Sequence, residues 1–163
     1  MKKALLFLFV SSLSFAQDYA FIDKIQSSDE TLPAYLAEKF IPGYKFVKNN
    51  YPLPTVYYLY LPNSTPESKV QEYIKGGYNP NEIRLNYNVE DGYYTFESMF
   101  GDCDLVWKVW TKYIQPEPKE RKPREGYTFT NKEKRIIYQF GDNASGCTIY
   151  NVYSKYGKYE ARD

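Results

Sequence analysis

The stretch from residue 83 to residue 100 constrains the fold most, because it predicts two neighbouring antiparallel strands and the turn between them. Apolar residues alternate with polar ones on the first strand, at Ile83, Leu85, Tyr87 and Val89. Asp91-Gly92 follows, a pair that favours a two-residue hairpin turn. Pairing across this turn predicts four inward-facing pairs: Val89–Tyr94, Tyr87–Phe96, Leu85–Ser98 and Ile83–Phe100. A slip of one residue would turn every side chain to the other face, so the pattern specifies the register.

A second tight turn at Gly101-Asp102 extends this hairpin into a predicted three-stranded meander, because glycine in the first turn position suits a primed turn. The third strand then runs from Cys103 to Trp110. Trp107 and Trp110 lie three residues apart, so on a strand they point to opposite faces. We expect Trp107 in the core and Trp110 on the other face.

The remaining sequence supplies helices, further strands and a loop. Helical spacing and end signals predict helices over 28–40 and 65–76. Further strands are expected over 44–48, 55–61, 134–140 and 147–153, and a proline-rich charged segment over 115–125 predicts an extended loop. The predicted fold class is α+β. It has a mostly antiparallel twisted sheet of about five to seven strands, with two helices on one face.

The N-terminal segment has the pattern of a secretory signal peptide. Two lysines precede a short apolar run, and Ser14-x-Ala16 precedes a polar residue, which predicts cleavage after Ala16. A single domain over 17–163 would remain, secreted or periplasmic and without a lipid-anchor cysteine at the cleavage site. Loss of the two lysines changes the formal charge from +1 to −1. This balance disfavours nucleic acid as a partner, and we expect no membrane insertion after cleavage.

The absence of histidine limits the chemistry of this chain. It excludes Ser-His-Asp, Cys-His and zinc-histidine arrangements within the chain. We therefore predict no catalytic residue, no metal and no cofactor. The only two cysteines, Cys103 and Cys147, predict a disulfide in an oxidising compartment.

The 19 tyrosines suit either a half-buried sheet or a recognition surface. The meander predicts a candidate binding face on the side away from its core. Its residues are Tyr93, Trp110, Lys108, Glu97, Arg84, Asn86 and Asn88. A Tyr93–Trp110 pair among polar neighbours could hold a protein partner or stack on a sugar. Whether a helix or loop covers this face stays open at this point.

These patterns favour an exported, soluble, non-catalytic binding protein, with another protein as the first expected partner, as in an inhibitor or an immunity protein. A glycan-binding module is the alternative. An enzyme is the less favoured class, in the form of a cell-wall or glycan hydrolase that would use two carboxylates, such as Glu97 with Glu90. A further hypothesis is a calcium site formed by turn oxygens, at Asp102, Asp104, Asp142 and Asn143. The oligomeric state is not indicated.

Overall fold

The computed structural model describes residue 22 and the ranges 25–49, 55–76, 81–115, 120–131 and 136–153. The predicted signal peptide over 1–16 lies outside the described residues, as do parts of the predicted loop at 115–125. No helix in the described ranges is both long and apolar enough to cross a bilayer.

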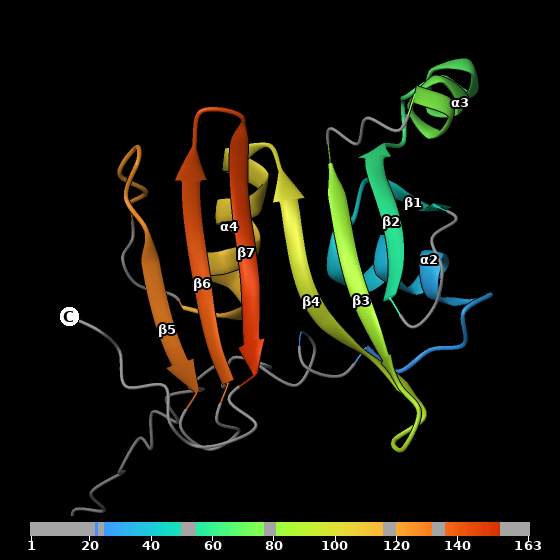
Figure 1. Ribbon diagram of the computed structural model, residues 1–163. Helices are drawn as coiled ribbons and strands as arrows, with labels where there is room; N and C mark the ends of the chain where they lie inside the picture. The colour runs from blue at the N-terminus through green and yellow to red at the C-terminus, as the bar shows by residue number, and fades with distance from the viewer. Residues whose placement is uncertain are drawn as a thin grey trace, which may run out of the picture.

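Within the described ranges, seven strands form one antiparallel sheet in the order β1-β2-β3-β4-β7-β6-β5 (Figure 1). The strands are β1 Tyr44–Asn49, β2 Thr55–Pro62, β3 Glu82–Asn88, β4 Tyr93–Gly101, β5 Tyr127–Asn131, β6 Ile136–Asn143 and β7 Gly146–Tyr153. The α+β class is therefore confirmed. The strands expected over 134–140 and 147–153 are present as β6 and β7, which pair as a hairpin, whereas β5 was not predicted.

Helices lie on one face and at one end of this sheet (Figure 1). They are α2 Leu32–Tyr35, the π-helix η1 Leu36–Phe40 that continues it, α3 Glu67–Gly76 and α4 Cys103–Tyr113. Figure 1 shows α2 and α4 behind the sheet and α3 at its end, beyond β2. Of the two predicted helices, the first, over 28–40, covers the sheet, whereas the second, over 65–76, lies at its end. The other covering helix is α4, which was predicted to be a strand.

The core lies between the sheet and these covering helices. Aromatic rings connect the layers: Phe40 stacks on Tyr113 at 5.3 Å between centroids, and Trp110 lies 5.7 Å from Phe140. The Tyr113 hydroxyl donates a hydrogen bond to the Phe40 carbonyl at 2.8 Å. Tyr58 and Tyr60 are also buried, and their hydroxyls donate hydrogen bonds to the Asp29 carboxylate and the Phe100 carbonyl, so much of the tyrosine content is structural.

The predicted third strand of the meander is wrong, because residues 103–113 form α4. Asp102 caps this helix and accepts hydrogen bonds from the Asp104 and Leu105 backbone N–H groups, both at 3.1 Å. The buried residues follow helical spacing at Val106, Val109, Trp110 and Tyr113. The strands that follow one another as sheet neighbours are instead β1, β2, β3 and β4, with α3 inserted between β2 and β3.

The predicted register of the β3–β4 hairpin is also wrong. Asn88 pairs with Tyr93, so the turn has four residues, Val89–Gly92, instead of two. The Asn88 side chain accepts a hydrogen bond from the Glu90 N–H at 3.0 Å, which ends the strand early. Val89, expected to face inward, is 80% exposed.

A bulge at Glu97 shifts the pairing a second time. Leu85 pairs with Phe96, whereas Arg84 pairs with Ser98. The expected pairs Leu85–Ser98 and Ile83–Phe100 are therefore absent. Met99 is buried towards the helices, and Ser98 takes the opposite face of β4.

The predicted disulfide between Cys103 and Cys147 is confirmed. Its Cα atoms lie 4.7 Å apart, and the bond joins residues separated by 44 positions. It connects the first residue of α4 to β7, so it fastens the covering helix to the middle of the sheet.

Asp29 connects the segment before α2 to the sheet. It forms an ion pair with Lys48 and accepts a hydrogen bond from the Tyr58 hydroxyl at 3.0 Å. Partial burial acts to raise the pKa of Asp29, but the bonds from Lys48 and Tyr58 prevail and lower it. Burial, with Asp29 nearby, raises the pKa of Tyr94 to about 12.

Candidate functional site

The face of the sheet opposite α2 and α4 carries one row of side chains that crosses all seven strands. Each member is the cross-strand partner of the next, so backbone pairing sets the row. Its members are Asn49, Tyr57, Arg84, Ser98, Tyr150, Gln139 and Thr128. With about 4.8 Å between neighbouring strands, the row is roughly 30 Å long. We call this surface the open face.

Tyr150 is the most exposed aromatic side chain of the row, with 46% of its surface exposed. A shallow hollow of about 480 Å³ lies beside it, towards β3 and β4. The hollow is lined by Arg84, Glu97, Ser98, Gln139, Tyr150 and Asn151. Apart from the tyrosine ring, every lining side chain is polar, so the hollow offers hydrogen-bond donors and acceptors around a single aromatic surface.

A second hollow, of about 360 Å³, lies on the other side of Tyr150, over β5 and β6. It shares Gln139 and Tyr150 with the first. Gly126 and Gly141 contribute only backbone to its lining, which leaves room between the flanking side chains. One tyrosine ring is thus bounded by two hollows along the same row.

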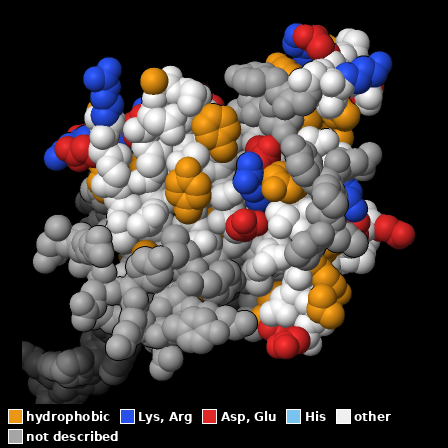
Figure 2. Space-filling model, in the orientation of Figure 1, with side chains coloured by type: hydrophobic (Ala, Val, Ile, Leu, Met, Phe, Trp, Pro, Cys, Tyr) orange, Lys and Arg blue, Asp and Glu red, His pale blue; other side chains and the backbone are white. Residues whose placement is uncertain are grey.

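Arg84 is the cation that lines the first hollow. Its Nε lies 2.6 Å from a Glu82 carboxylate oxygen, and its guanidinium lies 4.8 Å from the centre of the Tyr57 ring. The bond to Glu82 raises the pKa of Arg84, desolvation opposes this, and Glu97 adds to the rise. Figure 2 shows a basic side chain among acidic ones near the middle of this face. Two carboxylates and one guanidinium leave a local formal charge of −1.

The backbone explains why the first hollow lies where it does. Glu97 is the additional residue of the β4 bulge, and the β4–β7 pairing ends at Ser98–Tyr150. Beyond this pair the two strands separate (Figure 1). The Asn151 side chain compensates by donating a hydrogen bond to the Phe96 carbonyl at 2.7 Å. The hollow therefore lies where the strands separate and a polar side chain replaces backbone pairing.

The structure brings some of the predicted binding residues together. Arg84 and Glu97 both line the first hollow. Asn86 is exposed on the same strand, two residues from Arg84 and so on the same face. Asn88 and Tyr93 lie further along, at the end of the hairpin.

The prediction that Trp110 lies opposite Tyr93 on a strand is wrong. Trp110 is fully buried on α4, between the helix and the sheet. Lys108 is exposed but belongs to the same helix, on the opposite side of the sheet from the open face. Neither residue belongs to the candidate site. On a helix, residues two apart in the sequence point in different directions, so they do not share one face as they would on a strand.

Tyr150, Gln139 and Ser98 were missed by the sequence analysis. The available signal was the alternation over 147–150, where Cys147 and Ile149 share one parity and Thr148 and Tyr150 share the other. Alternation places Tyr150 on the face away from Cys147 and Ile149. What it does not provide is the strand order, which places β7 beside β4 and so brings Tyr150 next to Ser98.

The carboxylates are not arranged as a hydrolase pair in the described part of the chain. Glu90 lies in the hairpin turn and Glu97 four residues beyond the closing pair on β4, so their backbones are more than roughly 13 Å apart. The other carboxylate near Glu97 is Glu82, and it is bound to Arg84. We see no acid facing Glu97 across an open space among the described residues.

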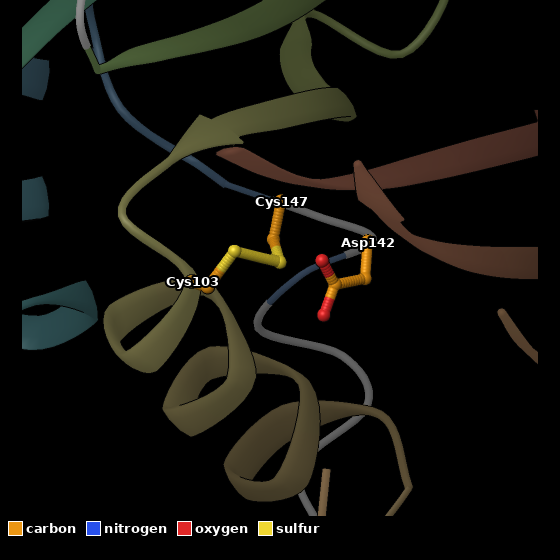
Figure 3. Close-up of side chains that lie close together, drawn as sticks. All are labelled: Cys103, Asp142 and Cys147. Carbon is orange, nitrogen blue, oxygen red and sulfur yellow. A yellow bond between two sulfur atoms is a disulfide. The ribbon is translucent and has the colours of Figure 1, made fainter. Parts of the chain in front are cut away.

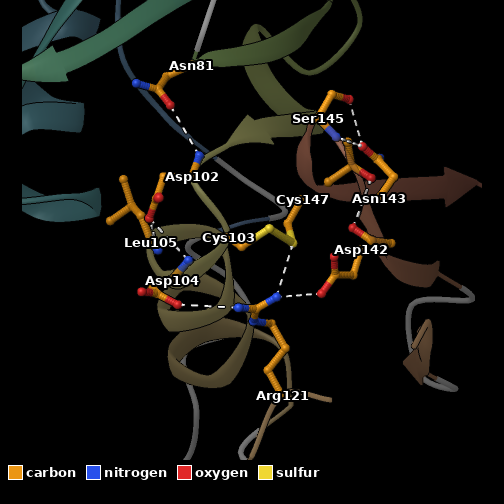
Figure 4. The surroundings of a disulfide bond; sticks show 12 residues. Asn81, Asp102, Cys103, Asp104, Leu105, Arg121, Asp142, Asn143, Ser145 and Cys147 are labelled. Atoms are coloured by element: carbon orange, nitrogen blue, oxygen red, sulfur yellow. Dashed lines mark hydrogen bonds and ion pairs between the residues drawn. A yellow bond between two sulfur atoms is a disulfide. The ribbon is translucent and has the colours of Figure 1, made fainter. Parts of the chain in front are cut away.

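The acidic residues near the disulfide have other partners. The Asp142 carboxylate lies beside the sulfur atoms (Figure 3), and Arg121 forms ion pairs with Asp142 and, at 3.5 Å, with Asp104 (Figure 4). Asp102 caps α4, and Asn143 accepts a hydrogen bond from the Ser145 N–H at 3.1 Å. The cysteines are bonded to each other. These oxygens therefore bind protein groups where α4 meets the β6–β7 turn. They give the calcium hypothesis no support.

We compared the chain with protein-family models, curated proteins and solved structures, and none of them matches it.

Proposed function

We propose that this is an exported, non-catalytic binding protein that holds a glycan chain on the open face of its sheet. One observation carries the proposal: the exposed ring of Tyr150 lies between two hollows, the first of which is otherwise lined by polar side chains. Export follows from the predicted signal peptide and suits the disulfide. The mature protein would then meet glycans outside the cytoplasm.

The chemistry of the hollows favours a sugar over a large protein surface. A sugar ring has an apolar C–H face, which stacks on an aromatic ring, and hydroxyl groups at its edge, which bond to amides, hydroxyls and charged groups. Tyr150 supplies the ring, and Gln139, Ser98 and Asn151 supply the polar groups. Around Tyr150 the first hollow is lined by polar side chains, whereas the centre of a stable protein interface is more continuously apolar.

The local charge narrows the glycan class. Arg84 is already paired with Glu82, and Glu97 has only its longer-range attraction to Arg84 among the described groups. The net charge of −1 around the first hollow disfavours a polyanionic chain. We therefore propose a neutral glycan or one that carries amino groups.

The hydrolase alternative has less support, because Glu97 lacks a facing acid among the described residues. A two-carboxylate mechanism needs a second carboxyl group across the bound sugar, at about 5–10 Å. In the described part of the first hollow, the charged group beside Glu97 is the Arg84 guanidinium. The arrangement suits holding a ligand better than cleaving one.

The proposal is tested by titrating the mature, oxidised protein with soluble oligosaccharides in a calorimeter. The probes are neutral cello-oligosaccharides, N-acetylated and deacetylated chito-oligosaccharides, and anionic oligogalacturonides. We expect saturable binding to a neutral or amino-sugar probe and none to the anionic one. Tyr150→Ala should weaken that binding at least about tenfold, because the stacking surface is lost.

Tyr73→Ala is the matched control, since it removes a partly exposed tyrosine from α3, away from the open face. This variant should bind like the unsubstituted protein. Failure of every probe to bind, or equal weakening by both substitutions, would overturn the proposed glycan site.

A further inference from the structure

The row across the open face holds a second aromatic side chain, Tyr57 on β2. Backbone pairing leads from Tyr57 through Arg84 and Ser98 to Tyr150, so three strand steps separate the two tyrosines. At about 4.8 Å for each step, their backbones lie roughly 14 Å apart along the row. Tyr57 is partly exposed. One row therefore carries two aromatic rings that can both contact a ligand lying across the strands.

Tyr57 and Arg84 form one contact surface. The Arg84 guanidinium lies 4.8 Å from the centre of the Tyr57 ring, and its Nε donates to Glu82, whose side chain is only 13% exposed. These two contacts hold a long side chain in place, which lowers the entropy lost when a ligand binds it. Arg84 also lines the first hollow, and the N–H groups on its two Nη atoms can donate to sugar hydroxyls. The pair is therefore preorganised at the β3 side of this hollow.

The two hollows continue the same line. The first is lined by Arg84 at one end and by Tyr150 and Gln139 at the other, and the second lies beyond Tyr150, over β5 and β6. Their volumes, about 480 and 360 Å³, each fall within the rough 300–1,000 Å³ range of small-ligand sites. Two separate small molecules would compete for Gln139 and Tyr150, which line both hollows, whereas one chain can run through both. The order along the row therefore indicates a single elongated ligand.

We propose that the open face binds one extended oligosaccharide across its strands, with Tyr57 and Arg84 as a second glycan contact in addition to Tyr150. This inference rests on the proposed function and deepens it, because it gives the length and the course of the bound chain. A pyranose unit in an extended chain is about as long as one strand step, so sugars about three units apart would lie over the two tyrosines. From Tyr57 to Thr128 the row covers five strand steps, or roughly 24 Å. A chain of about five or six sugars would fill it.

The first test is a length series, titrated into the mature, oxidised protein in a calorimeter. The probes are the disaccharide, tetrasaccharide and hexasaccharide of cellulose, of chitin and of deacetylated chitin. In the series that binds, we expect the affinity to rise at least about tenfold from the disaccharide to the hexasaccharide, because only the longer chain reaches both aromatic contacts. Equal affinities for these two lengths would overturn the extended site and leave a glycan site at Tyr150. Failure of every length to bind would overturn the proposed function, and this inference with it.

The second test compares Tyr57→Leu with Tyr73→Leu as its matched control. Both tyrosines are partly exposed and lie beside a cation, Arg84 at 4.8 Å and Lys69 at 5.4 Å from the ring centres, but Tyr73 belongs to α3. Tyr57→Leu should weaken hexasaccharide binding about tenfold and leave disaccharide binding unchanged, because the short probe binds in the hollows beside Tyr150.

Tyr57→Phe should keep the hexasaccharide affinity, since it retains the ring, and Tyr73→Leu should bind both lengths like the unsubstituted protein. Unchanged hexasaccharide binding by Tyr57→Leu would overturn the second contact. Equal weakening of both lengths by this variant would show that Tyr57 acts through the fold, and it would overturn the inference as well.

Discussion

Aromatic residues lie on both faces of the sheet, but they are buried on one face and exposed on the other. On the helix-covered face, Trp110 and Tyr113 are buried against the sheet and the disulfide fastens their helix. On the open face, Tyr150 stays half exposed and its neighbours are polar. Aromatic content alone therefore does not locate a binding surface in this protein. What separates the two roles is the layer that covers each ring.

Trp110→Ala should show the largest effect of this comparison. The side chain is fully buried and lies against Phe140, so its removal leaves a cavity in the core. We expect a loss of about 3–5 kcal/mol in the free energy of unfolding, measured by urea denaturation. Trp110→Phe should cost less, because it keeps an aromatic ring and removes an indole N–H that has no partner among the described groups. Equal stability of the alanine variant would mean that α4 does not cover the core.

The two tryptophans also show why the sequence wrongly predicted a strand where α4 lies. Apolar residues recur at every second position at Leu105, Trp107 and Val109, as they do along a strand. The same residues satisfy helical spacing through Val106, Val109, Trp110 and Tyr113. Valine and tryptophan favour strands, so propensity supported the wrong period. Asp102 was the deciding signal, because its side chain caps the helix instead of forming a hairpin turn.

Other parts of the fold were predictable, because their sequence signals lie close together along the chain and indicate the same structure. The β6–β7 hairpin is flanked by apolar residues and turn formers, and the disulfide needed only the two available cysteines. The candidate site was less predictable. The open-face row depends on the strand order and on the bulge at Glu97, and neither can be derived from one strand at a time.

Asp29→Asn should have an intermediate effect, because Asp29 anchors the segment before α2 through Lys48 and Tyr58. We expect a loss of about 1 kcal/mol near pH 7, since the carboxylate is partly exposed and its ion pair is screened. The folded protein lowers the pKa of Asp29 below its ordinary 3.8. The stabilisation is therefore fully present above that value and is lost as the pH falls through the folded-state pKa.

The measurement for Asp29 is urea unfolding from pH 7 to pH 2. The difference between the two proteins should be constant down to about pH 4 and shrink below it. Glu30→Gln is the control, because it removes the neighbouring exposed carboxylate. A difference that grew on acidification, or an equal effect of Glu30→Gln, would exclude the proposed anchoring by Asp29.

The smallest expected effect belongs to the open face. Tyr150→Ala and Gln139→Ala should each change the free energy of unfolding by less than about 0.5 kcal/mol, because both side chains are exposed and lie outside the helix-covered core. The same Tyr150 substitution is expected to weaken glycan binding about tenfold. A residue that matters for binding and not for stability is what a functional surface requires, whereas Trp110 should behave in the opposite way. Destabilisation of Tyr150→Ala by more than about 2 kcal/mol would place Tyr150 under a covering segment and remove the basis for treating this face as open.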